Sequence, residues 1–291
     1  MKKFVSFLFL LCCVNFVYPQ GRVVESLELN SRVLGKTVKY SIYLPANYNA
    51  AQRRFPVLYL LHGYSDDETG WTQFGEVERI TNDAVSKNEA TEMIIAMPGA
   101  GVSWYINDAA GKLKFEDFFV SEFIPYIDSM YKTRAKKEYR SVAGLSMGGY
   151  GTLIYAMKHP ELFVACAPLS AAVWSDDHII EIPAKDWTQY KFNELYGSNQ
   201  EGKARLTKHW YSNSIIKLAE TIPVEKLNQV RYYIDCGDDD FLIEGNMALH
   251  AALTRKKVKH EFRVRDGVHD WTYWRTALPE VLKFITESFH R

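Results

Sequence analysis

The segment SVAGLSMGGYG at residues 141–151 constrains the fold of this chain more than any other. A run of β-branched and small residues leads into Gly144-x-Ser146-x-Gly148, and apolar residues at helical spacing follow at once. Strand, tight turn and helix are the setting of a nucleophile elbow, where a serine takes strained backbone angles. Side chains two residues to either side would collide across so sharp a turn, which explains both glycines. We therefore expect Ser146 to stand exposed at the carboxyl edge of a sheet.

Segments typical of strands alternate with segments typical of helices along the rest of the chain. Residues 23–29 and 37–44 alternate apolar and polar side chains, which predicts an antiparallel hairpin at a sheet edge. Further strands are expected at 56–61, 93–97, 163–170, 230–236 and 261–265, and helices at 71–86, 115–130 (kinked at Pro125), 241–257 and 272–289. This order predicts an α/β fold, a mostly parallel sheet with helices on both faces. Residues 171–227 read as irregular and are expected to form a small cap over the site.

The amino terminus differs in character from the rest of the chain. Met1-Lys2-Lys3 precedes an apolar run over residues 4–17, which fits a secretory signal and is too short to span a bilayer comfortably. We therefore expect residues 1–20 to be a signal peptide, and the protein to be exported without stable membrane insertion. Leu11 and Cys12 stand where a lipidation signal normally needs a small residue, which disfavours a lipid anchor at Cys12 or Cys13.

Composition limits the partners of the mature chain, residues 21–291, which we expect to form one domain. Lys plus Arg and Asp plus Glu both number 35 in the full chain, and removal of residues 1–20 takes away only Lys2 and Lys3, so no basic face is implied and a nucleic-acid partner is not expected. Cys166 and Cys236 lie in apolar, strand-like runs, where a thiol is usually a small buried hydrophobe. The sequence therefore predicts no disulfide framework and no metal-ligand cluster.

Two loops downstream of the elbow carry the groups that a reactive serine needs. A serine hydroxyl is a poor nucleophile at neutral pH, so it requires an imidazole to take its proton and a carboxylate to orient that imidazole. His269 follows the last predicted strand, and Asp238, Asp239 and Asp240 follow the strand before it. The residues alone do not choose among the three acids. His62, after an earlier strand, is expected to be a hydrogen-bonded loop histidine without a catalytic role.

These residues carry a resemblance that spans most of the mature chain. His62-Gly63, Gly70-Trp71, Ser103-Trp104-Tyr105, the elbow, Asp235-Cys236-Gly237-x-x-Asp240 and Gly267-x-His269-x-Trp271 resemble the esterase D superfamily, in particular its tributyrin esterase and feruloyl or acetylxylan esterase group. The resemblance implies an α/β-hydrolase fold with no metal and no organic cofactor. It also implies roles: Ser146 as nucleophile, His269 as general base and then acid, Asp240 as its partner, and the backbone N–H groups of Met147 and Tyr64 as oxyanion donors.

The substrate is less constrained than the chemistry. Secreted members of the family commonly remove ferulate or acetate from plant hemicellulose, so we expect a small acyl ester or an acylated polysaccharide. Aromatic residues near the predicted site are expected to stack a phenolic acyl group or a sugar, with ordinary core packing as the alternative: Trp71, Phe74, Trp104, Tyr105 and Trp271.

Three other functions remain to be weighed against hemicellulose esterase activity. A generalist short-chain esterase is the main competitor. Cytosolic relatives hydrolyse S-formylglutathione, but an exported protein would not meet that thioester. An inactive binding module would normally have lost the nucleophile, base or a glycine, whereas all are present here. The sequence leaves the oligomeric state open.

Overall fold

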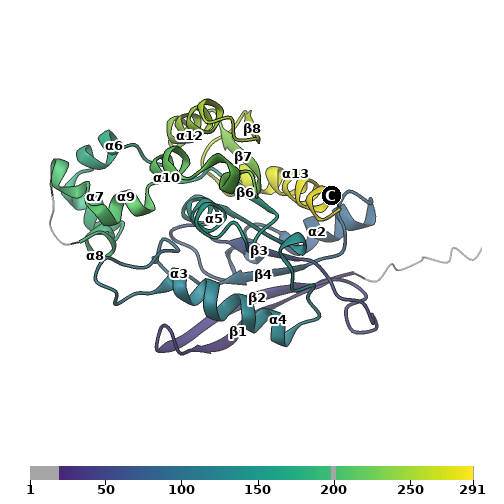
Figure 1. Cartoon of the computed structure of the whole chain (residues 1–291). Helices are drawn as coiled ribbons and strands as arrows, with labels where there is room; N and C mark the ends of the chain where they lie inside the picture. Colours follow the sequence, from purple (N-terminus) through teal and green to yellow (C-terminus); the bar gives the residue numbers. More distant parts are fainter. Residues whose placement is uncertain (1–19, 198–200, 291) are drawn as a thin grey trace, which may run out of the picture.

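A twisted sheet of eight strands forms the centre of the computed structural model, which describes residues 20–197 and 201–290 (Figure 1). The strands are Arg22–Ser31 (β1), Lys36–Leu44 (β2), Val57–Leu61 (β3), Ile94–Pro98 (β4), Arg140–Leu145 (β5), Ala165–Leu169 (β6), Arg231–Gly237 (β7) and His260–Arg265 (β8). Their spatial order is β1-β2-β4-β3-β5-β6-β7-β8. The hairpin β1–β2 is antiparallel and lies at one edge, β2 is antiparallel to β4, and all later pairs are parallel. The predicted mostly parallel sheet with an edge hairpin is confirmed.

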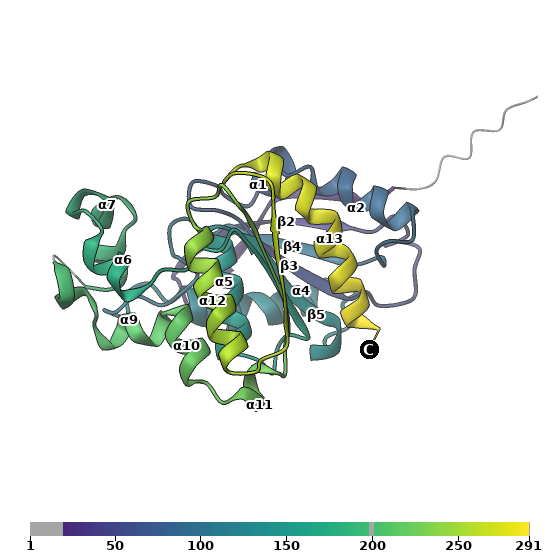
Figure 2. The ribbon, with the colours of Figure 1, turned by 90° about the horizontal axis from the view of Figure 1, so that it is seen from above.

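Strands β3 and β4 contain no charged residue because both faces of the sheet are covered. In β3, Tyr59 and Leu61 point into the core beneath one helical layer, and Leu58 and Leu60 into the core beneath the other. Helices α5 (Met147–Lys158) and α12 (Ile243–Arg255) cover the first face, whereas α2 (Val77–Ser86) and α13 (Trp271–Phe289) cover the second (Figure 2). This arrangement is the α/β-hydrolase fold expected from the resemblance.

Two predicted helices are interrupted. The segment 71–86 divides into α1 (Gly70–Gln73) and α2, with Glu76 between them in the left-handed conformation at φ 51°. The segment 115–130 is α3 (Phe115–Phe118), a π-helical turn η1 (Phe119–Phe123) and α4 (Ile124–Met130). Pro125 lies in the first turn of α4, where its missing N–H costs little, and the wider π turn precedes it. The expected single kinked helix is therefore a helix with a π insertion.

The segment 171–227 is more regular than its sequence indicated. It forms short helices: α6 (Asp176–Glu181), α7 (Ala184–Gln189), α8 (Phe192–Leu195), η3 (Gly202–Arg205), α9 (Lys208–Asn213), α10 (Ile215–Thr221) and α11 (Val224–Leu227). Ser175, Thr207 and Ser214 cap three of them by accepting the N–H of the residue three positions on. Each helix is too short to show a clear periodicity in sequence, which explains the irregular pattern. The α6–α9 part projects to one side of the sheet (Figures 1 and 2).

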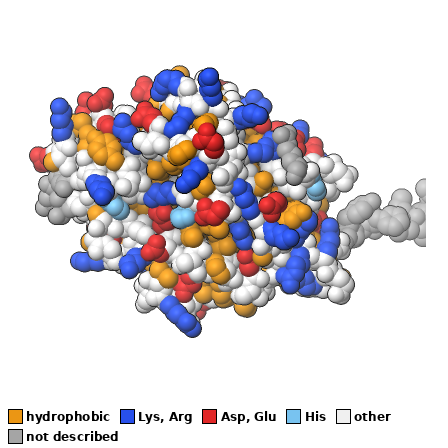
Figure 3. Space-filling model, in the orientation of Figure 1, with side chains coloured by type: hydrophobic (Ala, Val, Ile, Leu, Met, Phe, Trp, Pro, Cys, Tyr) orange, Lys and Arg blue, Asp and Glu red, His pale blue; other side chains and the backbone are white. Residues whose placement is uncertain are grey.

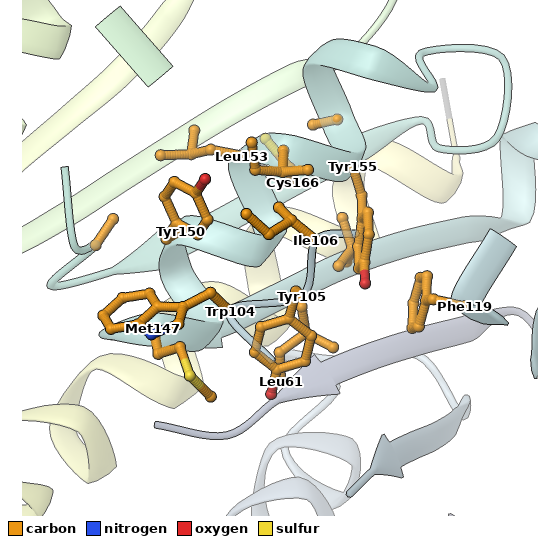
Figure 4. Close-up of a cluster of buried hydrophobic side chains, with 14 of the residues drawn as sticks. Leu61, Trp104, Tyr105, Ile106, Phe119, Met147, Tyr150, Leu153, Tyr155 and Cys166 are labelled. Carbon is orange, nitrogen blue, oxygen red and sulfur yellow. The ribbon is translucent and has the colours of Figure 1, made fainter. Parts of the chain in front are cut away.

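An aromatic cluster fixes the position of α5, the helix that follows Ser146 (Figure 4). The rings of Phe119 and Tyr155 stack with centroids 4.2 Å apart and planes 5° apart. Tyr105 packs edge-on against Tyr155, and a Cβ at Gly151 would lie only 2.5 Å from the Tyr105 ring. Because the backbone of α5 is in such close contact with these rings, the helix has little freedom to shift. The position of Ser146, which directly precedes α5, is restricted in the same way.

The surface carries both signs of charge. Figure 3 shows Lys and Arg side chains interspersed with Asp and Glu over the face in view. Among residues 20–197 and 201–290, no helix combines the length and apolar character that a membrane span requires. Cys166 and Cys236 are buried free thiols, as expected. The predicted signal peptide lies outside the described residues, Gln20 excepted.

Candidate active site

Ser146 occupies a strained turn between β5 and α5. Its backbone angles are φ 53° and ψ −116°, a conformation that non-glycine residues rarely adopt. A Cβ at Gly148 would lie 2.4 Å from the carbonyl oxygen of Leu61, and one at Gly144 would lie 2.6 Å from the carbonyl oxygen of Gly148. Both glycines are therefore required by close backbone approach. The Ser146 N–H donates to Leu169 at 2.9 Å, which ties the turn to β6.

His269 and Asp240 complete a continuous chain of contacts with Ser146. His269 Nε2 lies 2.9 Å from Ser146 Oγ, and His269 Nδ1 lies 2.8 Å from Asp240 Oδ2. The backbone N–H of Leu242 donates to the other carboxylate oxygen of Asp240 at 2.8 Å. An imidazole held by a carboxylate on one nitrogen and facing a hydroxyl on the other can take the hydroxyl proton.

The geometry distinguishes the three consecutive acids. Asp240 is 1% exposed and contacts His269, whereas Asp238 and Asp239 are exposed. Asp238 instead accepts the N–H of Gly267 at 3.0 Å and so joins the β7 loop to the loop that carries His269. The acid that the resemblance selected is thus the one that touches the imidazole.

Burial and hydrogen bonding act in opposite directions on Asp240. Burial alone raises the pKa of a carboxyl group, but the hydrogen bond and charge of His269 and the Leu242 N–H favour the ionised form. The net result is a pKa of Asp240 below its ordinary value. The carboxylate is therefore charged at neutral pH, the state that stabilises an imidazolium at His269.

The two N–H groups expected to bind an oxyanion come from adjacent elements. Met147 is the first residue of α5, so its N–H has no acceptor within that helix. Tyr64 lies in the loop after β3, where a Cβ at Gly63 would approach the Leu145 side chain to 2.7 Å. The β3 loop therefore lies directly against the elbow. Tyr64 also donates its hydroxyl to the carbonyl of Gln189 in the cap.

A cavity of about 510 Å³ opens at this point. Its wall includes Ser146 and His269, together with Tyr64 and Asp66 from the β3 loop. Burial raises the pKa of the Asp66 carboxyl above its ordinary value. This cavity is large enough for a small acyl group together with part of an alcohol.

The five aromatic residues expected near the site lie in three different settings. Trp104 and Trp271 line the cavity. Trp71 and Tyr105 do not: they are 1% and 0% exposed, and they donate to the backbone carbonyls of Leu61 at 2.9 Å and His62 at 3.0 Å. The expectation of a substrate contact is wrong for these two residues, because their rings fill the core beneath the loops. Phe74 is 51% exposed and packs against Trp271 outside the cavity.

Several further residues of the cavity wall were not predicted as site residues from the sequence. Trp174, Gln189 and Tyr190 come from the cap, and Phe241 follows Asp240 directly. Tyr190 accepts the Trp104 indole N–H through its carbonyl at 2.8 Å, so the cap also orients a predicted wall residue. The expectation that the cap lies over the site is confirmed. Of these residues, Trp174 could have been suspected from the sequence as a large aromatic residue in the cap, whereas no motif marks Gln189, Tyr190 or Phe241.

His62 has the structural role expected of it. Its Nδ1 lies 2.7 Å from the carbonyl oxygen of Gly63, and its Nε2 accepts the N–H of Ala100 at 2.8 Å. Burial lowers the pKa of His62 from 6.5 to about 4, so the ring is neutral and can accept that bond. His62 thereby ties the β3 loop to the loop after β4.

One group of acidic side chains in the described part of the chain has the spacing of a metal site: Asp238, Asp239 and Asp266. All three are exposed, and Asp238 already accepts a backbone N–H. Such a group is common on protein surfaces, and the Ser146 cavity contains none of its members.

Comparisons with known proteins identify the family to which this chain is similar. Residues 31–285 match the family described as "Putative esterase". The acetyl esterase of Caldicellulosiruptor saccharolyticus is 28% identical over 283 residues, covering 91% of this chain and 98% of that protein. The endo-1,4-beta-xylanase/feruloyl esterase of Xylanibacter ruminicola is 31% identical over 163 residues, which cover 54% of this chain and 22% of that longer protein.

A solved ferulic acid esterase is 34% identical to this chain. The two structures superpose with a TM-score of 0.81 over 94% of this chain and 100% of that one. The family match and this likeness confirm the resemblance drawn from the motifs. The chain therefore belongs to the esterase family and is a carboxylic ester hydrolase with the α/β-hydrolase fold.

Proposed function

We propose that the protein is an exported serine carboxylesterase whose catalytic triad is Ser146, His269 and Asp240, and that it removes feruloyl or acetyl groups from plant hemicellulose. The observation that carries the triad is the unbroken series of contacts from Ser146 Oγ to His269 at 2.9 Å and from His269 to Asp240 at 2.8 Å. The exported location is supported by the basic and apolar residues of the first twenty positions.

The reaction follows from these contacts in two steps. Ser146 Oγ attacks the ester carbonyl while His269 Nε2 takes its proton, and His269 then returns that proton to the departing alcohol oxygen. The acyl group is left on Ser146 Oγ. Water, deprotonated by the same nitrogen, attacks the acyl-enzyme and releases the acid, and the proton returns to Ser146. Asp240 holds the Nδ1 proton and stabilises the imidazolium.

The N–H groups of Met147 and Tyr64 are the proposed donors to the oxyanion. Both flank Ser146, one at the N-terminus of α5 and the other in the β3 loop. Fixed donors aimed at the developing charge commonly contribute on the order of 3 kcal/mol to the barrier reduction. The strained conformation of Ser146 places its own Oγ between these two elements.

The nature of the cavity wall supports an aromatic or small acyl group. Trp104 is 3% exposed and Trp271 half-buried, and both present ring surface to the space beside Ser146. Stacking and burial of a flat phenolic ring there would contribute about 1 to 3 kcal/mol. The names of the acetyl esterase and ferulic acid esterase relatives agree with these two acyl groups.

The substrate proposal is tested by comparing kcat/KM on methyl ferulate, acetylated xylan and p-nitrophenyl butyrate. Methyl ferulate or acetylated xylan should be hydrolysed at least as efficiently as the butyrate, although p-nitrophenol is a far better leaving group. Brisk hydrolysis of the butyrate alone would instead indicate a generalist short-chain esterase. Culture fractionation with and without residues 1–20 tests export: the full chain should leave the cytoplasm and the shortened chain should stay there.

A further inference from the structure

A second cavity adjoins the one at Ser146. It has a volume of about 340 Å³ and lies between α6, α7 and the loop after β7; we call it the α6–α7 cavity. Its wall includes Trp174, Glu181, Pro183, Asp186, Tyr190 and Phe241. Trp174, Tyr190 and Phe241 also line the cavity at Ser146. Three residues belong to both walls, so the two spaces are neighbours, and a ligand that passes over the exposed ring of Phe241 can reach both.

The position of Phe241 shows which part of an ester would enter the α6–α7 cavity. The ring of Phe241 packs on the imidazole of His269, with centroids 4.6 Å apart. In the proposed reaction His269 gives its proton to the departing alcohol oxygen, so that oxygen must lie at Nε2. An alcohol that continues past Phe241 then reaches the α6–α7 cavity. This space therefore lies on the leaving-group side of the bond that breaks.

The side chains of this cavity suit a neutral, hydroxyl-rich ligand. Glu181 and Asp186 offer carboxylate oxygens, which accept hydrogen bonds from neighbouring hydroxyl groups. The rings of Trp174, Tyr190 and Phe241 can pack against the apolar face of a sugar ring. Among the described residues of this wall, Glu181 and Asp186 carry negative charge, His178 is a basic residue, and there is no Lys or Arg, so an anionic alcohol or thiol would meet mainly like charge.

We propose that the α6–α7 cavity binds the sugar to which the acyl group is attached, and that the enzyme thereby selects its ester by the alcohol as well as by the acid. The inference rests on the proposed function of Ser146 and His269. It assigns the cap helices α6 and α7, which project beyond α5 in Figure 2, a direct part in substrate choice. The favoured substrate is an ester of a neutral oligosaccharide.

The test compares two esters of the same acid, methyl ferulate and a feruloylated arabinoxylotriose, and the same pair with acetate. In each pair the acyl group is constant and only the alcohol reaches the α6–α7 cavity. Asp186→Ala should lower the ratio of kcat/KM for the oligosaccharide ester to that for the methyl ester by about tenfold, as for the loss of a hydrogen bond to a charged group. Glu181→Ala should lower the same ratio, and the double variant should lower it further.

Glu194→Ala on α8 is the matched control. Glu194 is an acidic cap residue that pairs with Lys191 at 2.8 Å and does not line the cavity, so its ratio should stay within about twofold of the unmodified enzyme. A ratio unchanged in the Asp186 and Glu181 variants, with both esters still hydrolysed, would overturn this inference alone. An enzyme that hydrolyses none of the four esters would contradict the proposed function, and this inference with it.

Discussion

Phe241 lies against His269 with ring centroids 4.6 Å apart, although 71% of the Phe241 residue surface is exposed. Trp274 packs edge-on against the same imidazole, at 4.9 Å. The His269 ring is thus held between two aromatic side chains as well as by Asp240. Phe241 directly follows the proposed catalytic acid, Asp240, and belongs to the walls of both cavities.

Phe241→Ala should lower kcat/KM for every ester by about three- to tenfold, because the imidazole loses one of the rings that restrict it and the cavities lose a shared wall. Thermal stability should change little, since the side chain is mostly exposed. Met247→Ala is the control: Met247 is 54% exposed on α12 and lines neither cavity. Equal effects of the two substitutions on kcat/KM would argue against a role for Phe241.

The same substitution can be compared at the three consecutive acids, Asp238, Asp239 and Asp240. Asp240→Asn should reduce kcat by on the order of 10⁴, because an amide neither stabilises the imidazolium nor favours the correct tautomer. Asp238→Asn and Asp239→Asn should remain within about tenfold, since both side chains are exposed and do not touch His269. The measurement is kcat of the three variants on one ester, with folding checked by circular dichroism. A severe defect in either of the latter variants, with an active Asp240→Asn enzyme, would reverse the assignment.

Trp271→Ala should reduce hydrolysis of methyl ferulate more than that of methyl acetate, by about ten- to hundredfold in the ratio of kcat/KM values, because only the phenolic ring can stack on the indole. Tyr105→Phe is the matched control. It removes the hydrogen bond to the His62 carbonyl, which should cost about 1 kcal/mol of stability without changing that ratio. A ratio unaffected by Trp271→Ala would remove this ring from acyl recognition.

The site could be predicted most accurately from the sequence at positions where both the backbone geometry and the proposed chemistry restrict the residue type. Gly144, Ser146 and Gly148 form a motif because the turn tolerates few alternatives, and the carboxyl ends of parallel strands bring Asp240 and His269 to the same edge. Choosing Asp240 among three acids required the family resemblance. From the residues alone, loop conformation decides which carboxylate turns inward, and no local pattern encodes it.

Whether an aromatic residue is buried in the core or lines the cavity was harder to predict from the sequence. Trp71 follows Gly70 and Trp271 follows the loop that carries His269, yet Trp71 is fully buried and Trp271 lines the cavity. A large ring fits a core as well as a binding wall, so burial depends on the packing of the whole fold. The position of the cap residue Tyr190 likewise depends on the packing of the whole fold. Its place beside Trp104 results from tertiary contacts of short helices that have weak sequence signals.

His62 should make stability depend on pH. Its pKa is about 4 in the folded protein and 6.5 when exposed, so the unfolded chain binds the proton first as pH falls. The contribution of the buried neutral ring is complete above pH 6.5 and is lost as pH drops towards 4. The free energy of unfolding of the unmodified protein minus that of His62→Gln should therefore fall by on the order of 2 to 3 kcal/mol over this interval. Urea unfolding at pH 7.5 and 4.5 measures this difference in the free energy of unfolding. The control is His178→Gln, at an exposed histidine. A difference between the unmodified protein and His62→Gln that does not change with pH would contradict the burial of a neutral ring at His62.

Covalent labelling of Ser146 tests directly whether this residue is the nucleophile. A fluorophosphonate reacts with an activated serine by displacement of fluoride, and intact-mass and peptide mass spectrometry locate the adduct. We expect one adduct on Ser146, none in Ser146→Ala, and much slower labelling in His269→Ala. Ester turnover by Ser146→Ala should fall by on the order of 10⁴ to 10⁶ in kcat with the fold unchanged. An adduct on another residue, or a Ser146→Ala protein that retains a tenth of its activity, would show that Ser146 is not the nucleophile.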